Sequence, residues 1–387
     1  MPGALSGPEL SEQVAGELRR IARFKDNVKV QCITGGVPVR RQERSLSHPP
    51  HIIVGTPGRI LKLVGRGSLT VADLETVVID EADRMLDMGF EEEMTAILDL
   101  LPVKRQTLCF SATFPEEIRN LGKRLLNAPR EISAETFHDP GAIEQHFFEV
   151  IPKDKFKVLL GILAHHAPES AVVFCNTKDT CRQVSERLRE QGLRSLALNG
   201  DLEQFERTET LIRFANGSCN ILVATDVAAR GLDIKSLDAV INYDIPFETE
   251  TYVHRIGRTG RAGRKGLAFS LVRPREAFRL EAVNEFLKRD FVMEMPGPEL
   301  DRDDADMDPQ MATLSIGGGR KDKIGPGDLL GALTARGGLD GSEVGKIDRL
   351  EKITYCAVDR NALQRAVRVL SDSTIKGRRI KVRSHDD

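Results

Sequence analysis

Short apolar runs alternate with stretches of helical spacing along most of the chain. Four runs in the first third have the length and the branched residues of strands: Val28–Ile33, His51–Gly55, Thr76–Ile79 and Gln106–Phe110. Apolar residues at helical spacing lie before and between them, in Leu10–Ile21 and Met85–Leu98. This alternation indicates βαβ units, and we expect Thr76–Ile79 to be buried on both faces of a parallel sheet. Met1–Gly7 shows no periodicity.

A second alternating series follows Pro129–Gly141, whose proline, histidine and aspartate without a period favour an interdomain linker. The strands predicted in this series are Val172–Cys175, Ser195–Leu198, Ile221–Ala224, Val240–Asn242 and Leu267–Leu271. A helix is expected from about Lys178, with Thr177 as its N-cap and its end near Gly192. The series therefore predicts a second, complete α/β domain.

The composition changes in Glu294–Pro309, where seven acidic residues oppose one arginine and the net charge is −6. With its three prolines, this segment is expected to be a flexible tether that does not pack on its neighbours. Met311–Asp387 then carries a net charge of +5. Its expected elements are the strand Ala312–Ile316, the helix Asp328–Ala335, the strand Ile353–Val358, a helix, and a last strand that alternates Ile380 and Val382 with basic residues. The order predicts a small α+β domain with a basic edge.

The whole chain has a net charge of −2 and a pI of about 6.5, so no global basic field indicates nucleic acid. Six cysteines are scattered without C-x-x-C spacing: Cys32, Cys109, Cys175, Cys181, Cys219 and Cys356. Most have apolar neighbours, so we expect buried reduced thiols and neither disulfides nor a zinc site. No apolar run approaches the ~18 residues of a membrane span, and the N-terminus lacks a signal pattern. A soluble, cytoplasmic protein without a membrane partner is expected.

The apolar run Thr76–Ile79 leads directly into Asp80-Glu81-Ala82-Asp83. Ligands of open α/β sheets bind just beyond the carboxyl ends of the strands. Two carboxylates at such a place suit a magnesium–nucleotide site, in which Asp80 would hold the metal and Glu81 would orient or deprotonate a water. A solvated acidic turn before a helix is the alternative, and this stretch alone does not decide between the two.

Three arginines recur at three-residue spacing in His254–Arg261, namely Arg255, Arg258 and Arg261. Such spacing places guanidinium groups on one helical face. Arginines that face a phosphate site stabilise the charge that develops during phosphoryl transfer. Taken alone, such spacing is more often typical of a solvated face or of one that binds phosphate backbones.

Eight pieces of the chain, in this order, resemble the DEAD-box RNA helicase family. They are Gly35-Gly36, Thr56-Pro57-Gly58-Arg59, Asp80-Glu81-Ala82-Asp83, Ser111-Ala112-Thr113, Asn176-Thr177, Gln204 with Arg207, Thr225–Asp233 and His254–Arg261. As a set they are highly specific. The C-terminal part, with Gly317–Lys321 and Ile375–Arg379, resembles the RNA-binding domain of DbpA-like helicases. That domain is similar to an RRM and recognises a hairpin of large-subunit ribosomal RNA.

The resemblance implies a role for each matching residue, and ATP and Mg²⁺ as cofactors. Asp80 is similar to the magnesium-coordinating acid and Glu81 to the residue that activates water. Arg258 and Arg261 match phosphate-contacting arginines, Gly231 and Asp233 match nucleotide contacts, and Ser111 and Thr113 match residues that couple hydrolysis to strand separation. The implied RNA-binding residues are Thr56, Gly58, Arg59, Thr177, Gln204, Arg207, Thr225, Arg320, Lys321, Arg378 and Arg379.

Two departures from the family pattern bear on activity. The P-loop pattern G-x-x-x-x-G-K-[ST] occurs nowhere in the 387 residues. The family's Pro-Thr-Arg-Glu-Leu motif is replaced by Ser6-Gly7-Pro8-Glu9-Leu10. The family's P-loop segment would precede Met1, so we expect a first domain shortened by a truncated reading frame, with apolar strand edges exposed. A genuine short protein is the alternative.

The expected organisation is a truncated RecA-like α/β domain (1–132), a linker (133–142), a second RecA-like domain with a parallel sheet (143–294), an acidic tether (295–309) and an RRM-like α+β domain (310–387). The expected function is that of an ATP-dependent RNA helicase acting on ribosomal RNA in large-subunit assembly. We expect a monomer whose partners are RNA and ribosome precursor particles. The alternative is a catalytically inactive RNA-binding fragment, because a P-loop normally binds the phosphates.

Overall fold

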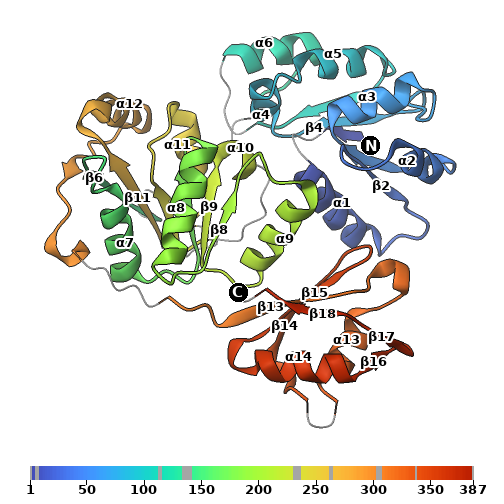
Figure 1. Cartoon of the computed structure of the whole chain (residues 1–387). Coiled ribbons are helices and arrows are strands. Elements are labelled where there is room, and N and C mark those ends of the chain that lie inside the picture. Colours follow the sequence, from blue (N-terminus) through green and yellow to red (C-terminus); the bar gives the residue numbers. More distant parts are fainter. Residues whose placement is uncertain are drawn as a thin grey trace. The chain divides into compact units, whose positions relative to one another are not determined.

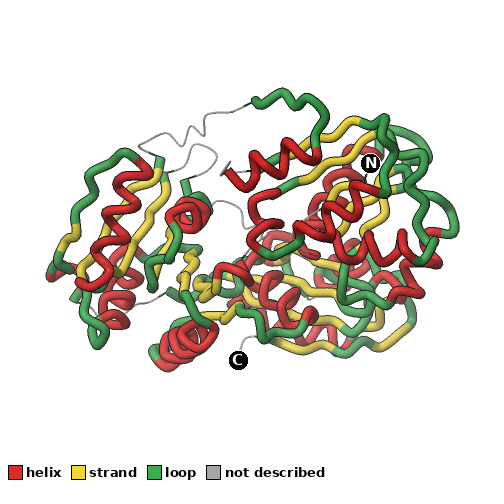
Figure 2. Tube along the Cα trace, turned by 90° about the horizontal axis from the view of Figure 1, so that it is seen from above, coloured by secondary structure: helices red, strands yellow, loops and turns green. Residues whose placement is uncertain are grey.

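The computed structural model describes residues 2–4, 8–111, 116–132, 142–229, 237–260, 265–301, 307–335 and 338–385. The chain forms two compact units (Figure 1). The first unit holds a five-stranded sheet, and the second holds a seven-stranded sheet and a four-stranded sheet. Figure 2 shows strands flanked by helices in each unit. Within these described ranges, no helix has both the length and the apolar character needed to cross a membrane.

The sheet of the first unit is parallel and has the order β2-β3-β1-β4-β5. Its strands are β1 (Pro2–Ala4), β2 (Val30–Ile33), β3 (Ile52–Gly55), β4 (Thr76–Ile79) and β5 (Gln106–Cys109). Its helices are α1 (Pro8–Ala22), α2 (Val39–Leu46), α3 (Pro57–Gly65), α4 (Ala82–Asp87), α5 (Glu91–Asp99) and α6 (Glu116–Leu125). The predicted alternation of strands and helices is confirmed.

Two apolar clusters hold the helices of this unit to its sheet. One joins α3, α4 and α5 to the sheet and contains Val77 and Ile79 of β4. The other joins α1 to β2 and β3. Because side chains alternate along a strand, Thr76 and Val78 point to the second face, where they are only partly buried. The expectation that β4 is buried on both faces is therefore wrong.

Two other expectations for the first unit are corrected. Pro2–Ala4 forms β1 between β3 and β4, although Met1–Gly7 carries no periodicity. Backbone groups make this pairing, so side-chain pattern gives no sign of it. The single helix expected over Met85–Leu98 is in fact two helices. Gly89, with a φ of 75°, follows the end of α4 and turns the chain before α5 begins.

The seven-stranded sheet of the second unit is also parallel, with the order β12-β6-β11-β10-β7-β9-β8. Its strands are β6 (Ile143–Glu149), β7 (Ala171–Cys175), β8 (Ser195–Leu198), β9 (Ile221–Thr225), β10 (Ala239–Asn242), β11 (Gly266–Val272) and β12 (Met293–Glu294). The five predicted strands are confirmed. Two strands were missed, because β6 carries polar residues in its middle and β12 has two residues.

Helices cover both faces of this sheet (Figure 1). They are α7 (Lys155–His166), α8 (Lys178–Glu190), α9 (Gln204–Ala215), α10 (Asp226–Ala229), α11 (Thr249–Ile256) and α12 (Ala277–Leu287). One core cluster packs α7 and α8 on the strands, and another packs α11 and α12 on β6 and β11. The predicted start of α8 is confirmed, since Thr177 Oγ1 accepts a hydrogen bond from the N–H of Thr180 at 3.1 Å.

The C-terminal sheet is antiparallel, with the order β14-β15-β13-β18. Its strands are β13 (Met311–Ile316), β14 (Val344–Arg349), β15 (Thr354–Asp359) and β18 (Val382–Ser384), and it packs with α13 (Pro326–Leu333) and α14 (Leu363–Asp372). The predicted small α+β domain is confirmed, but β14 was not predicted. The prediction of a single last strand is wrong, because β16 (Thr374–Ile375) and β17 (Arg378–Arg379) form a separate hairpin before β18. Lys376 and Gly377 both have positive φ at its two-residue turn.

The C-terminal sheet makes side-chain hydrogen bonds with α9 and the turn after it. Asn216 Nδ2 donates to Thr313 Oγ1 at 2.9 Å, and Thr313 Oγ1 donates to Ser218 Oγ at 2.7 Å. Tyr355 donates its hydroxyl hydrogen to Glu209 Oε2 at 2.9 Å. Thr313 and Tyr355 are fully or almost fully buried. The four-stranded sheet is therefore joined to the seven-stranded sheet by specific, buried polar contacts.

The acidic segment packs on α7, which contradicts the expectation of a free tether. Pro298–Leu300 forms a short 3₁₀ helix, and Leu300 and Met307 belong to the core cluster that contains α7. The carbonyl oxygen of Leu300 lies so close to Gly161 that a Cβ on this glycine would meet it at 1.9 Å. Charge and proline content predict an exposed chain, but two apolar anchors outweigh them in the described parts of the segment.

The six cysteines are free thiols, five of them buried and Cys109 partly buried, as the sequence predicts. Burial raises the pKa of Cys181 and Cys219 to about 11 and that of Cys32 and Cys356 to about 12. These thiols therefore stay protonated at neutral pH and are poor nucleophiles.

We expect Leu300→Ala to lower the free energy of unfolding by about 2–4 kcal/mol, because it removes a buried side chain from a core cluster. Glu299→Ala is the matched control, since Glu299 is the exposed neighbour in the same 3₁₀ helix. Urea denaturation of the full chain would give both values. Equal midpoints for the two variants would show that the acidic segment is not anchored.

Candidate functional site

The acidic sequence after β4 forms a tight turn at the carboxyl end of the strand. Glu81 adopts the left-handed conformation, with a φ of 52°, which is uncommon for a residue other than glycine. The N–H of Glu81 donates to Asp80 Oδ1 at 2.9 Å, and the N–H of Ala82 donates to the carbonyl oxygen of Phe110 at 3.0 Å. The turn thus holds Asp80 and Glu81 at the adjacent ends of β4 and β5, where the sequence predicts a ligand site.

The turn gathers negative charge. Burial raises the pKa of Asp80, and the nearby carboxylates of Glu81 and Asp83 raise it further. Arg84 Nη1 donates to Glu81 Oε1 at 2.6 Å and holds that side chain. Asp80 Oδ2 accepts no hydrogen bond from the part of the chain that the structure describes. A partly buried carboxylate with an open oxygen beside other carboxylates fits a hard divalent cation such as Mg²⁺.

Ser111, the predicted coupling residue, contacts this turn directly. Its Oγ accepts a hydrogen bond from the N–H of Asp83 at 3.2 Å. Ser111 follows β5, so a movement of the chain after β5 would change the turn that carries the two acids. Thr113, its predicted partner, lies outside the described residues.

The predicted RNA-binding residues of the first unit lie around the start of α3. Thr56 is its N-cap residue, and a Cβ at Gly58 would meet nothing within 4 Å. The backbone there is open to a ligand. Arg59 Nη1 instead donates to the carbonyl oxygen of Val37 at 2.6 Å and to Gln42 Oε1 at 2.7 Å. Arg59 thus braces both α2 and the loop before it, and these contacts limit how far it can reach toward RNA.

The predicted RNA-binding residues of the second unit lie at neighbouring strand ends. Thr177 follows β7 and Thr225 ends β9, and these two strands pair in the sheet. Gln204 begins α9, and Arg207 Nη2 donates to the carbonyl oxygen of Ala228 in α10 at 2.6 Å. The structure therefore brings Thr177 and Thr225 to one edge of the sheet. Gly231 and Asp233, the predicted nucleotide contacts, lie outside the described residues.

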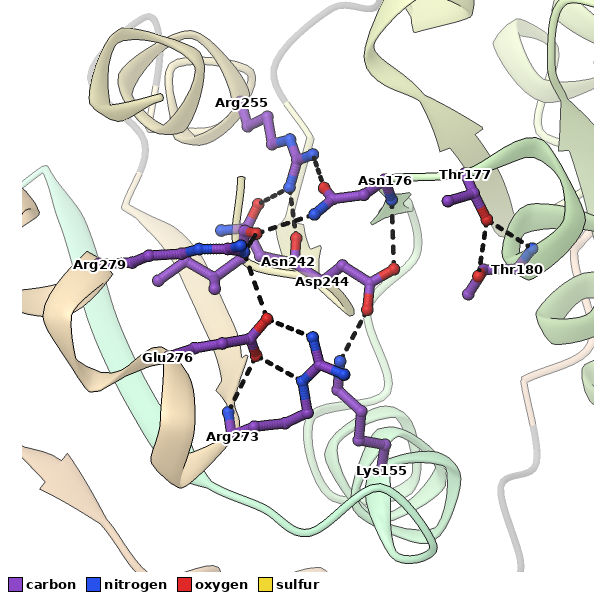
Figure 3. A network of polar contacts seen from close by, with 11 residues as sticks. Lys155, Asn176, Thr177, Thr180, Asn242, Asp244, Arg255, Arg273, Glu276 and Arg279 are labelled. Atoms are coloured by element: carbon purple, nitrogen blue, oxygen red, sulfur yellow. Dashed lines mark hydrogen bonds and ion pairs between the residues drawn. The ribbon is translucent and has the colours of Figure 1, made fainter. Parts of the chain in front are cut away.

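Arg255 and Arg258 do not share a helical face, so the prediction is wrong for these two arginines. Helix α11 ends at Ile256, and Arg258 lies in the turn after it and is half-buried. Arg255 is 2% exposed and points into a network of polar side chains (Figure 3). Arg261 lies outside the described residues. The three-residue spacing of the arginines places side chains on one helical face only within a helix, and α11 ends at Ile256, before Arg258.

The predicted RNA-binding residues of the C-terminal domain come together from distant parts of the sequence. Arg320 and Lys321 lie in the 3₁₀ helix Arg320–Asp322, and Arg378 and Arg379 form β17. Arg378 Nη1 lies 3.4 Å from Asp322 Oδ1, so the two segments are adjacent. Arg378 keeps 71% of its side chain exposed. We call Arg320, Lys321, Arg378 and Arg379 the basic cluster.

Three family comparisons cover most of the chain. Residues 8–121 match the DEAD/DEAH box helicase family, residues 154–263 match the helicase conserved C-terminal domain, and residues 313–384 match the DbpA RNA binding domain. The ATP-dependent RNA helicase DbpA of Escherichia coli (strain K12) is 47% identical over 375 residues, which are 97% of this chain and 82% of that protein. The chain belongs to the DbpA-like DEAD-box RNA helicases. The family is ATP-dependent, which implies hydrolase activity.

Other DEAD-box helicases are similar over about three quarters of the chain. The DEAD-box ATP-dependent RNA helicase CshA of Geobacillus kaustophilus (strain HTA426) is 46% identical over 295 residues, 76% of this chain and 62% of that protein. The structure of S. cerevisiae Dbp5 bound to RNA and ADP BeF3 has 30% identity and a TM-score of 0.69 over 78% of each chain. The predicted RecA-like helicase domains followed by an RNA-binding domain are thus confirmed.

This DEAD-box helicase also contains a set of buried and partly buried polar residues that its sequence pattern did not predict. Arg255 was noted only for its spacing, and Asp226, Asn242, Asp244 and Lys155 were not singled out. A signal was present, because Asn or Asp ends or directly follows three apolar strands of the second domain. When buried, the side-chain oxygens of such residues need hydrogen-bond donors, and a nearby arginine supplies them.

Beside this set, Glu276 is almost fully buried between Arg273 and Arg279 (Figure 3). Burial alone would raise the pKa of Glu276, but hydrogen bonds from Arg273 outweigh it and hold the pKa below its ordinary value of 4.5. An acid with a lowered folded-state pKa stabilises the fold above its unfolded-state pKa, and this contribution is lost as the pH falls through the folded-state pKa.

We expect Glu276→Gln to lower the urea midpoint at pH 7, and the difference from wild type to shrink as the pH falls below about 4.5. Urea titrations of both chains between pH 7 and pH 4 would measure this. A difference that stays constant over this range would contradict a stabilising, ionised Glu276.

Proposed function

We propose that this DEAD-box helicase remodels ribosomal RNA during assembly of the large subunit. The observation that carries the proposal is that one chain holds both an acidic strand-end turn and a DbpA-type RNA-binding domain with an exposed basic cluster. The proposed partners are a large-subunit ribosomal RNA hairpin and ribosome precursor particles, and the proposed state is a cytoplasmic monomer.

For the hydrolytic step, we assign Asp80 to the magnesium ion and Glu81 to the attacking water. Bound Mg²⁺ would supply charge neutralisation at the phosphates. Glu81 is suited to its role because Arg84 fixes its carboxylate at the strand end. Arg258 and Arg261 would stabilise charge on the transferred phosphoryl group, with Gly231 and Asp233 contacting the nucleotide. Ser111 would transmit changes in this turn, since it contacts Asp83.

For RNA, we assign two kinds of contact. Thr56, Gly58, Thr177, Gln204, Arg207 and Thr225 would hold the backbone of a strand, which suits an enzyme that acts on many sequences. Arg59 belongs to the same motif but acts mainly through the loop that it braces. The basic cluster would hold a hairpin, with preference set by its loop bases and shape.

A second function is an RNA-binding protein without hydrolysis. The observation that favours it is that the P-loop pattern does not occur in these 387 residues. P-loop backbone N–H groups and the P-loop lysine bind the phosphates between the acids and the arginines. The two functions share the RNA-binding assignments and differ only in whether the protein hydrolyses ATP.

We expect the full chain to bind a ribosomal hairpin more tightly than an unrelated hairpin. The double variant Arg378→Ala/Arg379→Ala should weaken hairpin binding and lower the slope of log affinity against log salt by about two. Arg365→Ala/Arg368→Ala on α14 is the control with the same change of charge on exposed side chains. Fluorescence anisotropy at several salt concentrations would measure both. Equal, weak binding to the two hairpins would rule out hairpin recognition.

We expect the 387 residues alone to show no RNA-stimulated ATP hydrolysis, because positioning of the phosphates supplies most of the catalysis in this chemistry. Joining a P-loop-bearing segment of a DEAD-box relative to the chain should produce activity. In that extended protein, Glu81→Gln should abolish turnover and Arg261→Ala should lower the rate by about 10³ or more.

A coupled ATPase assay would test these expectations, with exposed Glu92→Gln on α5 as the control. Robust hydrolysis by the 387 residues alone would show that the phosphates are held without a P-loop. Unchanged turnover in Glu81→Gln would show that the acidic turn is not the catalytic site.

A further inference from the structure

Arg255 has an acceptor for each of its five N–H donors. Nε and Nη2 donate to the two carboxylate oxygens of Asp226 at 2.6 and 2.7 Å. Nη2 also donates to Asn176 Oδ1 at 2.9 Å, and Nη1 donates to Asn242 Oδ1 at 3.1 Å and to the carbonyl oxygen of Asp244 at 2.6 Å. The side chain is 2% exposed. A charge buried in this way is stable only while its partners stay in place.

The partners of Arg255 come from the ends of three adjacent parallel strands. Asn176 follows β7, Asp226 follows β9, Asn242 ends β10, and Asp244 lies two residues further on. The order of these strands in the sheet is β10-β7-β9. Figure 3 shows Arg255 reaching toward Asn176, Asn242 and Asp244. One guanidinium group therefore clamps three strand ends to α11.

The network is closed by further hydrogen bonds among the partners. The N–H of Asn176 donates to Asp244 Oδ2 at 3.2 Å, and Asn176 Nδ2 donates to the carbonyl oxygen of Ile245 at 3.0 Å. Lys155 Nζ donates to Asp244 Oδ1 at 2.8 Å. Arg255 and Lys155 thus balance Asp226 and Asp244. A network whose charges and donors are paired is rigid and gives its members one preferred arrangement.

Two of the three clamped strand ends, and the turn after α11, carry residues with a proposed function. Thr177 follows Asn176 in the chain and Thr225 precedes Asp226, and both are proposed to hold RNA. Arg258 follows Arg255 by three residues, in the turn after α11, and is proposed to contact phosphate. Arg255 itself is buried, so it contacts neither RNA nor nucleotide. It joins the segments that are proposed to contact RNA and phosphate.

We propose that Arg255 is a positioning residue that fixes the RNA-binding strand ends relative to the segment carrying Arg258. RNA held at Thr177 and Thr225 then sets the position of the phosphate-contacting arginine, and RNA stimulation of ATP hydrolysis depends on the clamp. This inference rests on the proposed function for the roles of Thr177, Thr225 and Arg258, but the clamp itself rests on contacts within the second unit.

The variant that separates positioning from mere stability is Arg255→Lys, which keeps the charge and loses the planar fork. A lysine ammonium has three donors on one atom and cannot engage both Asp226 oxygens together with Asn176 and Asn242. Asp226→Asn is a second variant that keeps the shape of the partner and replaces one acceptor by a donor. It also serves if Arg255→Lys does not fold.

Arg279→Lys is the matched control. Arg279 has 13% of its side chain exposed, and its Nη1 donates to the carbonyl oxygen of Ile245 at 2.9 Å and to Glu276 Oε1 at 3.2 Å. It is a well-buried arginine in the same region (Figure 3), yet it contacts no strand end that carries a proposed RNA-binding residue. A purely structural effect of Arg→Lys exchange would therefore occur in both variants.

Hydrogen–deuterium exchange on the 387-residue chain gives the first readout. In Arg255→Lys and Asp226→Asn, peptides covering residues 174–180 and 223–228 should exchange faster under conditions where the chain stays folded. In Arg279→Lys these peptides should exchange as in wild type. Unchanged exchange in Arg255→Lys and Asp226→Asn would overturn the clamp.

ATP hydrolysis by the chain joined to a P-loop-bearing segment gives the second readout. Arg255→Lys and Asp226→Asn should lower the RNA-stimulated kcat by about 10- to 100-fold, the scale of a misplaced catalytic group, and should lower the ratio of stimulated to unstimulated rate. Arg279→Lys should leave this ratio within about twofold, less than 0.5 kcal/mol. Retained stimulation in Arg255→Lys and Asp226→Asn, or equal loss in Arg279→Lys, would overturn the positioning role. Absence of hydrolysis in the extended wild type would instead count against the proposed function, and the exchange result would still decide the clamp.

Discussion

A guanidinium group buried away from water needs an acceptor for each of its N–H donors, and Arg255 meets this need only where three strand ends and α11 converge. Asp226 neutralises its charge, while Asn176, Asn242 and Asp244 take the remaining donors. Removing any partner would leave a buried polar group unpaired, at a cost of about 1–3 kcal/mol. The same convergence brings Thr177 and Thr225 to one edge of the sheet. One side chain thus links three strand ends of the second RecA-like domain to α11 at this edge of its sheet.

The first unit positions its acids by a different physical means. Its acidic turn relies on a left-handed residue, Glu81, and on two hydrogen bonds. The N–H of Ala82 donates to the carbonyl oxygen of Phe110 and holds the turn against the end of β5, and the N–H of Glu81 donates to the Asp80 carboxylate within the turn. Burial and neighbouring carboxylates raise the pKa of Asp80, so the turn gathers charge that a bound cation would relieve. Strain and like charge at one place are typical of sites that are completed by a ligand. The second unit, in contrast, balances its charges internally.

Local pattern was enough to predict most strands, because buried parallel strands are apolar runs. It also located the candidate acids at the carboxyl end of a strand, where open α/β sheets bind their ligands. It failed where backbone pairing decides the structure, as in β1, and where polar residues occupy a strand, as in β6. It also failed for Arg255, whose acceptor Asn176 is 79 residues away in the sequence. Spacing assigned Arg255 to an exposed face, while long-range acceptors bury it.

The acidic segment shows how a few apolar contacts outweigh composition. Its net charge and prolines favour an extended chain, yet Leu300 and Met307 are buried in the core that contains α7. Each buried side chain of this size contributes about 1.5–3 kcal/mol. The contacts of Tyr355 with α9 and of Thr313 with the turn after it add polar specificity. A flexible tether would only raise the local concentration of RNA near the second domain. An anchored acidic segment also fixes the orientation in which the C-terminal domain presents RNA. Less conformational entropy is then lost when RNA engages both domains.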